Sequence, residues 1–299
     1  MRILIAGGGS GGHIYPALAV ARALRERRAD VELAWLGGRR GLEGSLVPPA
    51  GIPLQRLWLR SLRSTDLSPH LLLDPLRLAA ACPQAAALLL RRRPDAIFST
   101  GGYVALPVLG AAALLRIPSL LWEGNLVPGR STRLTARLAT VISTSFGATC
   151  RALGGNCHVT GTPIRSLAGI ERDAARAHFE AGSDERVVLV FGGSQAVARF
   201  DAAVGEALPQ LVERALVLHV TGDRSYAEAL RRREALPPER RRRYRPYPFL
   251  RDEMGEALLA ADLVVGRAGS STLAEATAVG LPLVVVPYPH AAGHQRANA

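Results

Sequence analysis

The stretch RILIAGGGSGGH, residues 2–13, decides the fold. A short apolar strand, Ile3–Ala6, runs directly into a loop that is glycine except for one serine, and a helical pattern follows. Glycine permits positive φ and lets backbone N–H groups approach an anion, which a helix N-terminus also attracts. Val187–Phe191 followed by GGSQA repeats the pattern in the second half. Two such units predict two nucleotide-binding lobes with a cleft between them, and favour a transferase that holds a donor against an acceptor.

Both halves of the chain alternate strand and helix signals, which is typical of a parallel sheet wrapped by helices. We therefore expect a doubly wound α/β lobe from residues 1–160 and another from 161–299, with the turn-rich segment 157–165 as the hinge. Strands are predicted in the first half at 2–6, 31–36, 95–99, 118–122 and 140–144, with helices notably at 16–28 and 71–92. The second half predicts strands near 187–191, 215–220, 262–265 and 283–287, and helices near 197–213, 224–234, 252–260 and 270–279.

The two ends of the chain carry further expectations. The N-terminus has no basic region followed by an apolar stretch and a cleavage site, so we expect no signal peptide. The longest apolar stretch, 104–122, contains Arg116 and two prolines, which favours a buried helix plus strand over a membrane span. The sequence stops at Ala299 inside the start of a helix, so we expect the second lobe to be truncated at its C-terminus.

The three cysteines, Cys82, Cys150 and Cys157, are odd in number and lack CxxC spacing. We expect packing residues in a reducing compartment and no zinc site. Charge is more informative. Residues 1–160 carry 19 arginines against 8 acids, and 161–299 carry 18 against 17, so the halves have net charges of +11 and +1. A basic first lobe predicts an anionic partner there: a membrane surface, a pyrophosphate or nucleic acid.

His13 is the candidate general base, because its imidazole would lie at the mouth of the first glycine loop. A helix-start histidine that only binds backbone is the alternative. Gly7, Gly9 and Gly12 also satisfy the weak GxGxxG pattern, but no acid follows the second strand as a dinucleotide site requires. An NADP site, with Arg39 and Arg40 on a 2′-phosphate, stays open.

The second half offers a diphosphate and ribose site. Gly192, Gly193, Ser194 and Gln195 present amides and polar side chains at a predicted helix N-terminus, although a tight structural turn is the alternative. In the segment 266–282, Ser270, Ser271 and Thr272 could cap a helix and donate to phosphate, while Glu275 could accept two ribose hydroxyls. His290, His294, Gln295 and Asn298 form a polar cluster without a third zinc ligand, so sugar binding is favoured over metal.

These motifs occur in the order found in the MurG family of bacterial N-acetylglucosaminyltransferases, and the resemblance spans the whole chain. It rests on GGGSGGHIYPALAVARAL, TGGYVALP (100–107), WEGNLVPGRSTRLTA (122–136), GTPIR (161–165), FGGSQ, GRAGSSTLAE and HQRANA. The resemblance implies a GT-B fold and an inverting transfer without metal or cofactor. The donor would be UDP-N-acetylglucosamine and the acceptor the lipid-linked muramyl-pentapeptide called lipid I, at the cytoplasmic face of the membrane and with no nucleic acid involved.

The family's functional residues map onto matching positions. His13 would be catalytic, and Ser10, Gly11 and Gly12 resemble a loop that contacts the pyrophosphate of donor and acceptor. Asn125 would lie near N-acetylglucosamine, and Leu250 would offer its backbone to uracil. The remaining donor contacts would be Arg165, Ser194, Gln195, Ser270, Ser271, Thr272, Leu273, Ala274, Glu275, Gln295 and Asn298.

This sequence also departs from the family pattern. Trp122 and Gly124 stand where many members have histidine and glutamine, so no base is assigned there, and Ala196 replaces a glycine. The family's final C-terminal helix is absent from the sequence. For membrane docking we expect Leu57–Leu59 and Leu71–Leu90, flanked by Arg60, Arg63, Arg77 and Arg91–Arg93, although helix core is the alternative for these leucines. A glycolipid synthase that uses diacylglycerol, an NADP-binding oxidoreductase and a non-catalytic binding protein are the competing functions.

Overall fold

The computed structural model describes residues 1–39, 41–59, 70–193, 198–288 and 294–299. The chain divides into two compact units, one of Met1–Ile164 with Asn298, the other of Arg165–Ala297 with Ala299. Each unit holds one sheet in which every strand pair is parallel. This is the doubly wound α/β architecture that the sequence predicts.

The first unit has a seven-stranded sheet in the order β3-β2-β1-β4-β5-β6-β7. Its strands are β1 (Arg2–Ala6), β2 (Glu32–Gly37), β3 (Leu54–Arg56), β4 (Ala96–Ser99), β5 (Ser119–Glu123), β6 (Val141–Thr144) and β7 (Cys157–Val159). Its helices are α1 (Gly11–Arg27), α2 (Glu43–Leu46), α3 (His70–Arg92), α4 (Ala105–Leu114), α5 (Arg130–Ala136) and α6 (Gly147–Leu153), with a 3-10 turn at Pro48–Ala50.

Alternation along β1 builds the two layers of core in the first unit. Ile3 and Ile5 pack with Ile14 and Ala17 of α1, whereas Leu4 and Ala6 pack with the residues of α3 and α4 on the opposite face. Successive side chains of a strand point to opposite faces, so a run that is apolar throughout requires a helix on each side.

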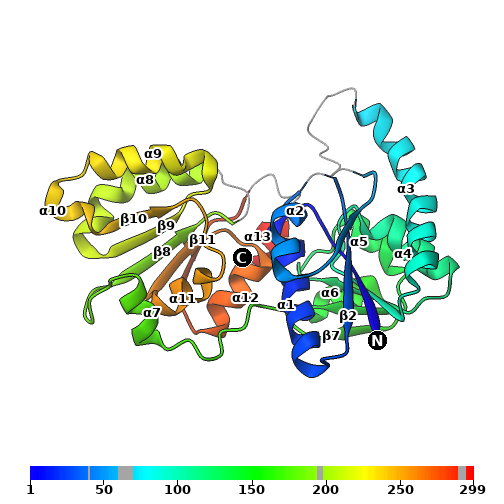
Figure 1. The fold of residues 1–299 in the computed structure, drawn as a ribbon. Helices are drawn as coiled ribbons and strands as arrows, with labels where there is room; N and C mark the ends of the chain where they lie inside the picture. Colours follow the sequence, from blue (N-terminus) through cyan, green and yellow to red (C-terminus); the bar gives the residue numbers. More distant parts are fainter. Residues whose placement is uncertain (40, 60–69, 194–197, 289–293) are drawn as a thin grey trace. The chain divides into compact units, whose positions relative to one another are not determined.

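The second unit has a five-stranded sheet in the order β10-β9-β8-β11-β12. Its strands are β8 (Val187–Phe191), β9 (Leu216–Val220), β10 (Tyr244–Tyr247), β11 (Leu263–Gly266) and β12 (Leu283–Val285). Its helices are α7 (Arg172–His178), α8 (Ala198–Arg214), α9 (Asp223–Glu234), α10 (Pro238–Arg241), α11 (Glu253–Ala260), α12 (Ser270–Ala278) and α13 (His294–Asn298). Helices α8 and α9 lie on one face, and α7, α11 and α12 on the other (Figure 1).

Three short strands were missed by the sequence analysis, namely β3, β7 and β10. Because β7 occupies Cys157–Val159, the first residues of the expected hinge belong instead to the sheet, where they pair with β6. Helix α1 begins at Gly11 rather than Pro16, and Pro16 lies inside it. The apolar stretch 104–122 forms α4 and most of β5, as predicted.

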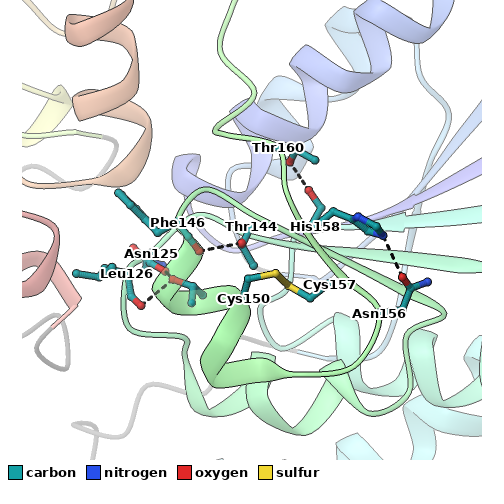
Figure 2. The surroundings of a disulfide bond; sticks show 11 residues. Asn125, Leu126, Thr144, Phe146, Cys150, Asn156, Cys157, His158 and Thr160 are labelled. Carbon is teal, nitrogen blue, oxygen red and sulfur yellow. Dashed lines mark hydrogen bonds between the residues drawn. A yellow bond between two sulfur atoms is a disulfide. The ribbon is translucent and has the colours of Figure 1, made fainter.

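The prediction that the three cysteines are packing residues was wrong. Cys150 of α6 is bonded to Cys157 of β7, with a Cα–Cα distance of 5.6 Å (Figure 2), and Cys82 is exposed. Gly154 and Gly155, both at positive φ, reverse the chain between the two cysteines. Such a turn places residues seven apart within disulfide range, which spacing alone does not reveal.

No helix in the described ranges is long and apolar enough to cross a membrane.

Fewer residues of the expected docking surface are exposed than predicted. Leu57 and Leu59 are core residues, and only Trp58 between them is exposed. On α3, Leu89 is buried while Leu76 and Leu90 are exposed. Arg60 and Arg63 lie outside the described residues.

Candidate active site

Both glycine loops lie at the point where their sheet reverses its winding direction. In the first unit the chain runs from β1 outward through β2 to β3 and then returns to β4 on the other side of β1. In the second unit β8 has the same position between β9 and β11. Loops that follow the two strands at such a switch point diverge, and ligands of doubly wound proteins bind there. Residues after β1, β4, β8 and β11 are therefore the candidates.

His13 lies in the first turn of α1 and is held by the loop after β4. Its Nδ1 is 2.6 Å from the carbonyl oxygen of Thr100, and the Thr100 hydroxyl donates to the His13 carbonyl at 2.8 Å. A carbonyl oxygen only accepts, so Nδ1 carries the proton and the neutral ring has its lone pair on Nε2. The ring is half-buried against Gly101 and Gly102, where an added Cβ would lie within 4 Å of it.

The loop between β1 and α1 is held by hydrogen bonds to two side chains of the first unit, those of Trp35 and Glu43. The indole of Trp35 donates to the Gly7 carbonyl at 2.8 Å, and the Gly9 amide donates to Glu43 Oε1 at 3.0 Å. Ser10 is the N-cap residue of α1, makes no side-chain capping bond, and accepts the amides of His13 and Ile14 at its carbonyl. The Ser10 hydroxyl and the exposed Gly12 are thus placed at the start of the helix beside His13.

Asn125 lies in the loop after β5, which a second buried carboxylate organises. Glu123 accepts the backbone and side-chain amides of Asn125 at 2.9 and 2.8 Å, and the Thr132 hydroxyl at 2.6 Å. In addition, the Thr149 hydroxyl donates to the carbonyls of Asn125 and Leu126. Glu123 therefore shapes this loop rather than facing solvent as a base.

Trp122, which replaces a histidine of the family pattern, is a structural residue. It is almost fully buried, and its indole donates to the Gly161 carbonyl at 3.0 Å. The substitution thus replaces a titratable ring by an indole that connects β5 to the segment after β7 through a hydrogen bond.

In the second unit, Arg267 supports the loop after β8. It follows β11, donates to the Gly192 carbonyl at 3.1 Å, and stacks on the Tyr288 ring at 4.2 Å. Burial lowers the pKa of its guanidinium. Gly193 adopts φ of 78°, which only glycine takes readily. Ser194, Gln195 and Ala196 lie outside the described residues.

Helix α12 starts at the switch point with an unusual N-terminus. Its N-cap is Gly269 without a side-chain capping bond, so the prediction that Ser270, Ser271 and Thr272 cap the helix was wrong. Thr272 is instead buried against Gly266. The Ser271 hydroxyl is buried and has no hydrogen-bond partner in the described part of the chain. Together with the unpaired amides of a first helical turn, it suits a phosphate oxygen.

Arg165 and Glu275, predicted separately as donor contacts, bind each other. Arg165 Nε donates to Glu275 Oε1 at 2.7 Å, and its Nη1 donates to the Arg251 carbonyl at 2.9 Å. Glu275 is only 5% exposed. Leu250, next to Arg251, has its side chain in the core, which leaves its backbone as the feature available at that position.

The predicted residues near the end of the sequence lie on or before α13. Gln295 accepts the Tyr288 amide at 2.8 Å, which joins α13 to the segment after β12. His294 and Asn298 are the first and last residues of this helix, and His290 lies outside the described residues. Among the described residues no group of three or more His, Cys, Asp or Glu side chains could hold a metal ion.

The sequence analysis missed Glu43, Thr100, Tyr103 and Arg267. Thr100 and Tyr103 belong to the motif TGGYVALP, which was used for the family resemblance, but no role was predicted for either residue. Glu43 follows the sequence GGRRG after the second strand, in which Arg39 and Arg40 were considered only for NADP binding. An acid placed among glycines, between Gly41 and Gly44, was the available clue.

Two family models cover most of the chain. Residues 3–144 match the glycosyltransferase family 28 N-terminal domain, and residues 187–299 match the glycosyltransferase family 28 C-terminal domain. The strands β1, β8 and β11 and the loops that follow them all fall within these matches.

Curated relatives share the whole length of the chain. A protein of Desulforamulus reducens is 37% identical over 310 residues, covering 100% of this chain and 82% of the relative. One of Magnetococcus marinus is 40% identical over 309 residues, covering 100% and 80%. Both are named UDP-N-acetylglucosamine-N-acetylmuramyl-(pentapeptide) pyrophosphoryl-undecaprenol N-acetylglucosamine transferase. The crystal structure of Acinetobacter baumannii MurG superposes with a TM-score of 0.70 at 29% identity, covering 99% of this chain and 81% of that one.

Proposed function

The chain belongs to glycosyltransferase family 28 and, within it, to the MurG transferases, and from this premise we propose the roles of its residues in the reaction. It transfers N-acetylglucosamine from UDP-N-acetylglucosamine to undecaprenyl-pyrophosphoryl N-acetylmuramyl-pentapeptide, a step of peptidoglycan synthesis. This membership sets aside the NADP-binding oxidoreductase that Arg39 and Arg40 left open. The observation that carries the assignment is 40% identity over the whole chain to a named transferase, together with a polar loop at each switch point.

His13 acts as the general base in this proposal. The muramyl 4-hydroxyl oxygen forms a bond to the anomeric carbon of the donor as the bond from that carbon to UDP breaks, and the hydroxyl proton passes to His13 Nε2. The Thr100 carbonyl supports this role, because it fixes the proton on Nδ1 and leaves Nε2 as the acceptor. Displacement in one step inverts the configuration of that carbon.

The second unit holds the donor and takes up the charge of the leaving group. The amides at the start of α12, the Ser271 hydroxyl and the loop after β8 would bind the diphosphate, and Arg165 would add a positive charge. Because Arg165 is already oriented by Glu275, its guanidinium needs little reorganisation on binding. Fixed donors of this kind supply the stabilisation that a divalent ion provides in other transferases.

Replacement of His13 by alanine tests the assignment. We expect kcat for sugar transfer to a lipid I analogue to fall by about 10²–10⁴, the usual contribution of a general base. The affinity for UDP-N-acetylglucosamine should largely remain, since most of the proposed donor contacts lie in the second unit. His158→Ala is the matched control, because His158 is exposed on β7 and its ring bonds the side chain of Asn156, away from the glycine loops. Unchanged turnover in a folded His13→Ala variant would remove the base from the mechanism.

We also propose that the protein works at the cytoplasmic face of the cell membrane, bound to it peripherally. The outward face of α3 supports this proposal. It carries Leu76, Ala79, Pro83, Ala87 and Leu90, all exposed and all apolar, whereas a surface helix normally shows polar residues there. The exposed Arg91, Arg92 and Arg93 follow directly and would attract anionic lipid.

A further inference from the structure

Glu43 is the most deeply buried acidic side chain of the described core, with 1% of its surface exposed. Its Oε1 accepts three hydrogen bonds, from the amides of Gly9 at 3.0 Å and Gly38 at 3.1 Å, and from the Tyr103 hydroxyl at 3.3 Å. The donors belong to the loops after β1, β2 and β4, three neighbouring strands of the sheet. Burying a carboxylate is costly unless such bonds compensate it, so this side chain holds the three loops together.

The carboxylate of Glu43 leaves no room for a side chain at the neighbouring glycines. A Cβ on Gly8 would lie 2.1 Å from Oε1, and a Cβ on Gly41 would lie 2.0 Å from Oε2. At Gly37 it would meet the Glu43 side chain at 3.0 Å. The glycine-rich sequence after β1 therefore has an internal anion to accommodate, and the Gly9 amide already donates to that anion instead of to a phosphate.

Glu43 connects the two segments that fix His13. Gly9 is followed by Ser10, whose carbonyl accepts the amides of His13 and Ile14 at 3.1 and 3.2 Å. Tyr103 ends the loop in which Thr100 bonds both the ring and the carbonyl of His13. One carboxylate oxygen thus binds the loop that carries the His13 backbone and the loop that orients its ring.

We propose that Glu43 is a positioning residue for the transfer reaction, which sets the orientation of the His13 imidazole by tying the loop 7–10 to the loop 100–103. The expected effect of Glu43 on the rate rests on the proposed role of His13 as the base. The expected effect of Glu43 on the orientation of the His13 ring does not depend on that role. Loss of this tie lets the two loops separate, so the ring leaves its fixed tautomer and direction. Misplacement by about 1 Å can cost about 10² in rate.

Three variants of the full chain test the proposal: Glu43→Ala, Glu43→Gln and Asp74→Asn. Alanine removes all three bonds, whereas glutamine keeps an oxygen that can accept them. Asp74 is a buried carboxylate of α3 that pairs with Arg77, so its variant controls for the loss of a buried charge. We expect Glu43→Ala to lower kcat by about 10–100-fold with an unchanged KM for the donor. Glu43→Gln should restore most of the rate, and Asp74→Asn should keep it.

The tautomer of the His13 ring is measured by ¹⁵N NMR of protein that carries ¹⁵N-labelled histidine, without substrate. We expect the His13 signals of the parent to show the Nδ1–H tautomer, and those of Glu43→Ala to shift towards the tautomer mixture of a free histidine. In the His13→Ala background, Glu43→Ala should add no further loss of kcat, because both changes act through the same group.

Each outcome bears on a separate claim. If Glu43→Ala leaves both the His13 signals and kcat at parent values, or slows the His13→Ala variant as much as the parent, Glu43 does not position His13. If His13→Ala keeps full turnover, the base role fails, while the NMR shift still reports the positioning. Should Glu43→Ala not fold, Tyr103→Phe replaces it, since it removes one bond to the same oxygen and keeps the ring, and a smaller change in the same direction is expected.

Discussion

Glu275, which we propose as a donor contact, is also a structural residue. It is nearly buried, and Arg165, with 21% of its side chain exposed, is the partner that compensates its charge. We expect Arg165→Met to lower the free energy of unfolding of the second unit by about 1–3 kcal/mol, because a buried carboxylate loses its partner. Adding Glu275→Met should recover most of that loss, since an apolar pair replaces buried charges at little cost.

Urea unfolding of the two variants measures this effect, and calorimetric titration with UDP separates stability from binding. We expect the double variant to regain stability without regaining affinity for UDP. Equal stability of the parent and the Arg165→Met variant would show that the pair contributes nothing to the fold.

Tyr103 should make the protein sensitive to alkaline pH. Burial and, second, the Glu43 carboxylate raise the pKa of its phenol above the usual range. An unfolded tyrosine ionises near pH 10, so the stability that Tyr103 contributes is complete below about pH 10 and is lost as the pH rises towards its folded pKa. We expect the urea midpoint of the parent to fall more steeply between about pH 10 and 12 than that of Tyr103→Phe, which cannot ionise in either state. Parallel pH profiles would contradict this prediction.

At the scale of elements, the strands that the sequence predicts are mainly central strands, and β12 is the one edge strand among them. Val187–Phe191 and Ile3–Ala6 are central strands covered by helices on both sides, so their sequence is an unbroken apolar run. The missed strands, β3, β7 and β10, are all edge strands, with sequences LQR, CHV and YRPY. An edge strand has one neighbour and more solvent, so its residues show no such pattern.

The candidate site was predictable where backbone geometry requires a residue type, and not where side chains from distant strands meet. The glycine loops at residues 7–12 and 192–193 were found because strand, glycine and helix follow one another in sequence. Glu43 and Tyr103 are separated by 60 positions, and only the order of β2, β1 and β4 brings them together. The pairing of Arg165 with Glu275 was hidden for the same reason.

The disulfide joins α6 to β7 and should stabilise this corner of the first unit. Cys150 and Cys157 are seven positions apart, and for so short a loop the chain-entropy model gives about 2.5 kcal/mol. We expect reduction to lower the free energy of unfolding of the first unit by about that amount. The Cys150→Ser/Cys157→Ser variant should be insensitive to reductant, and Cys82→Ser should respond like the parent. Denatured, unreduced protein should titrate a single thiol; three thiols would show that the bond does not form.

At the scale of the whole molecule, nearly all of the excess positive charge lies in the first unit. The exposed apolar face of α3 lies next to some of these arginines, Arg91–Arg93. Trp58, half exposed, lies next to α3, because its amide donates to Gln84 of that helix at 2.8 Å. Leu76 and Leu90 are 66% and 59% exposed, and 14 positions on a helix bring them to the same face. The combination of an apolar face with Arg91, Arg92 and Arg93 at its end matches the two requirements of interfacial binding.

Flotation with lipid vesicles tests the two requirements separately. We expect Leu76→Ser/Leu90→Ser to weaken binding to neutral and anionic vesicles alike, since it removes apolar area. By contrast, Arg91→Gln/Arg92→Gln should weaken binding only to anionic vesicles, by about 1 kcal/mol or fivefold for each arginine. Leu134→Ser is the matched control, because Leu134 of α5 is 54% exposed and lies outside α3. If the control loses as much binding as the α3 variant, the surface that meets the membrane is not the outward face of α3.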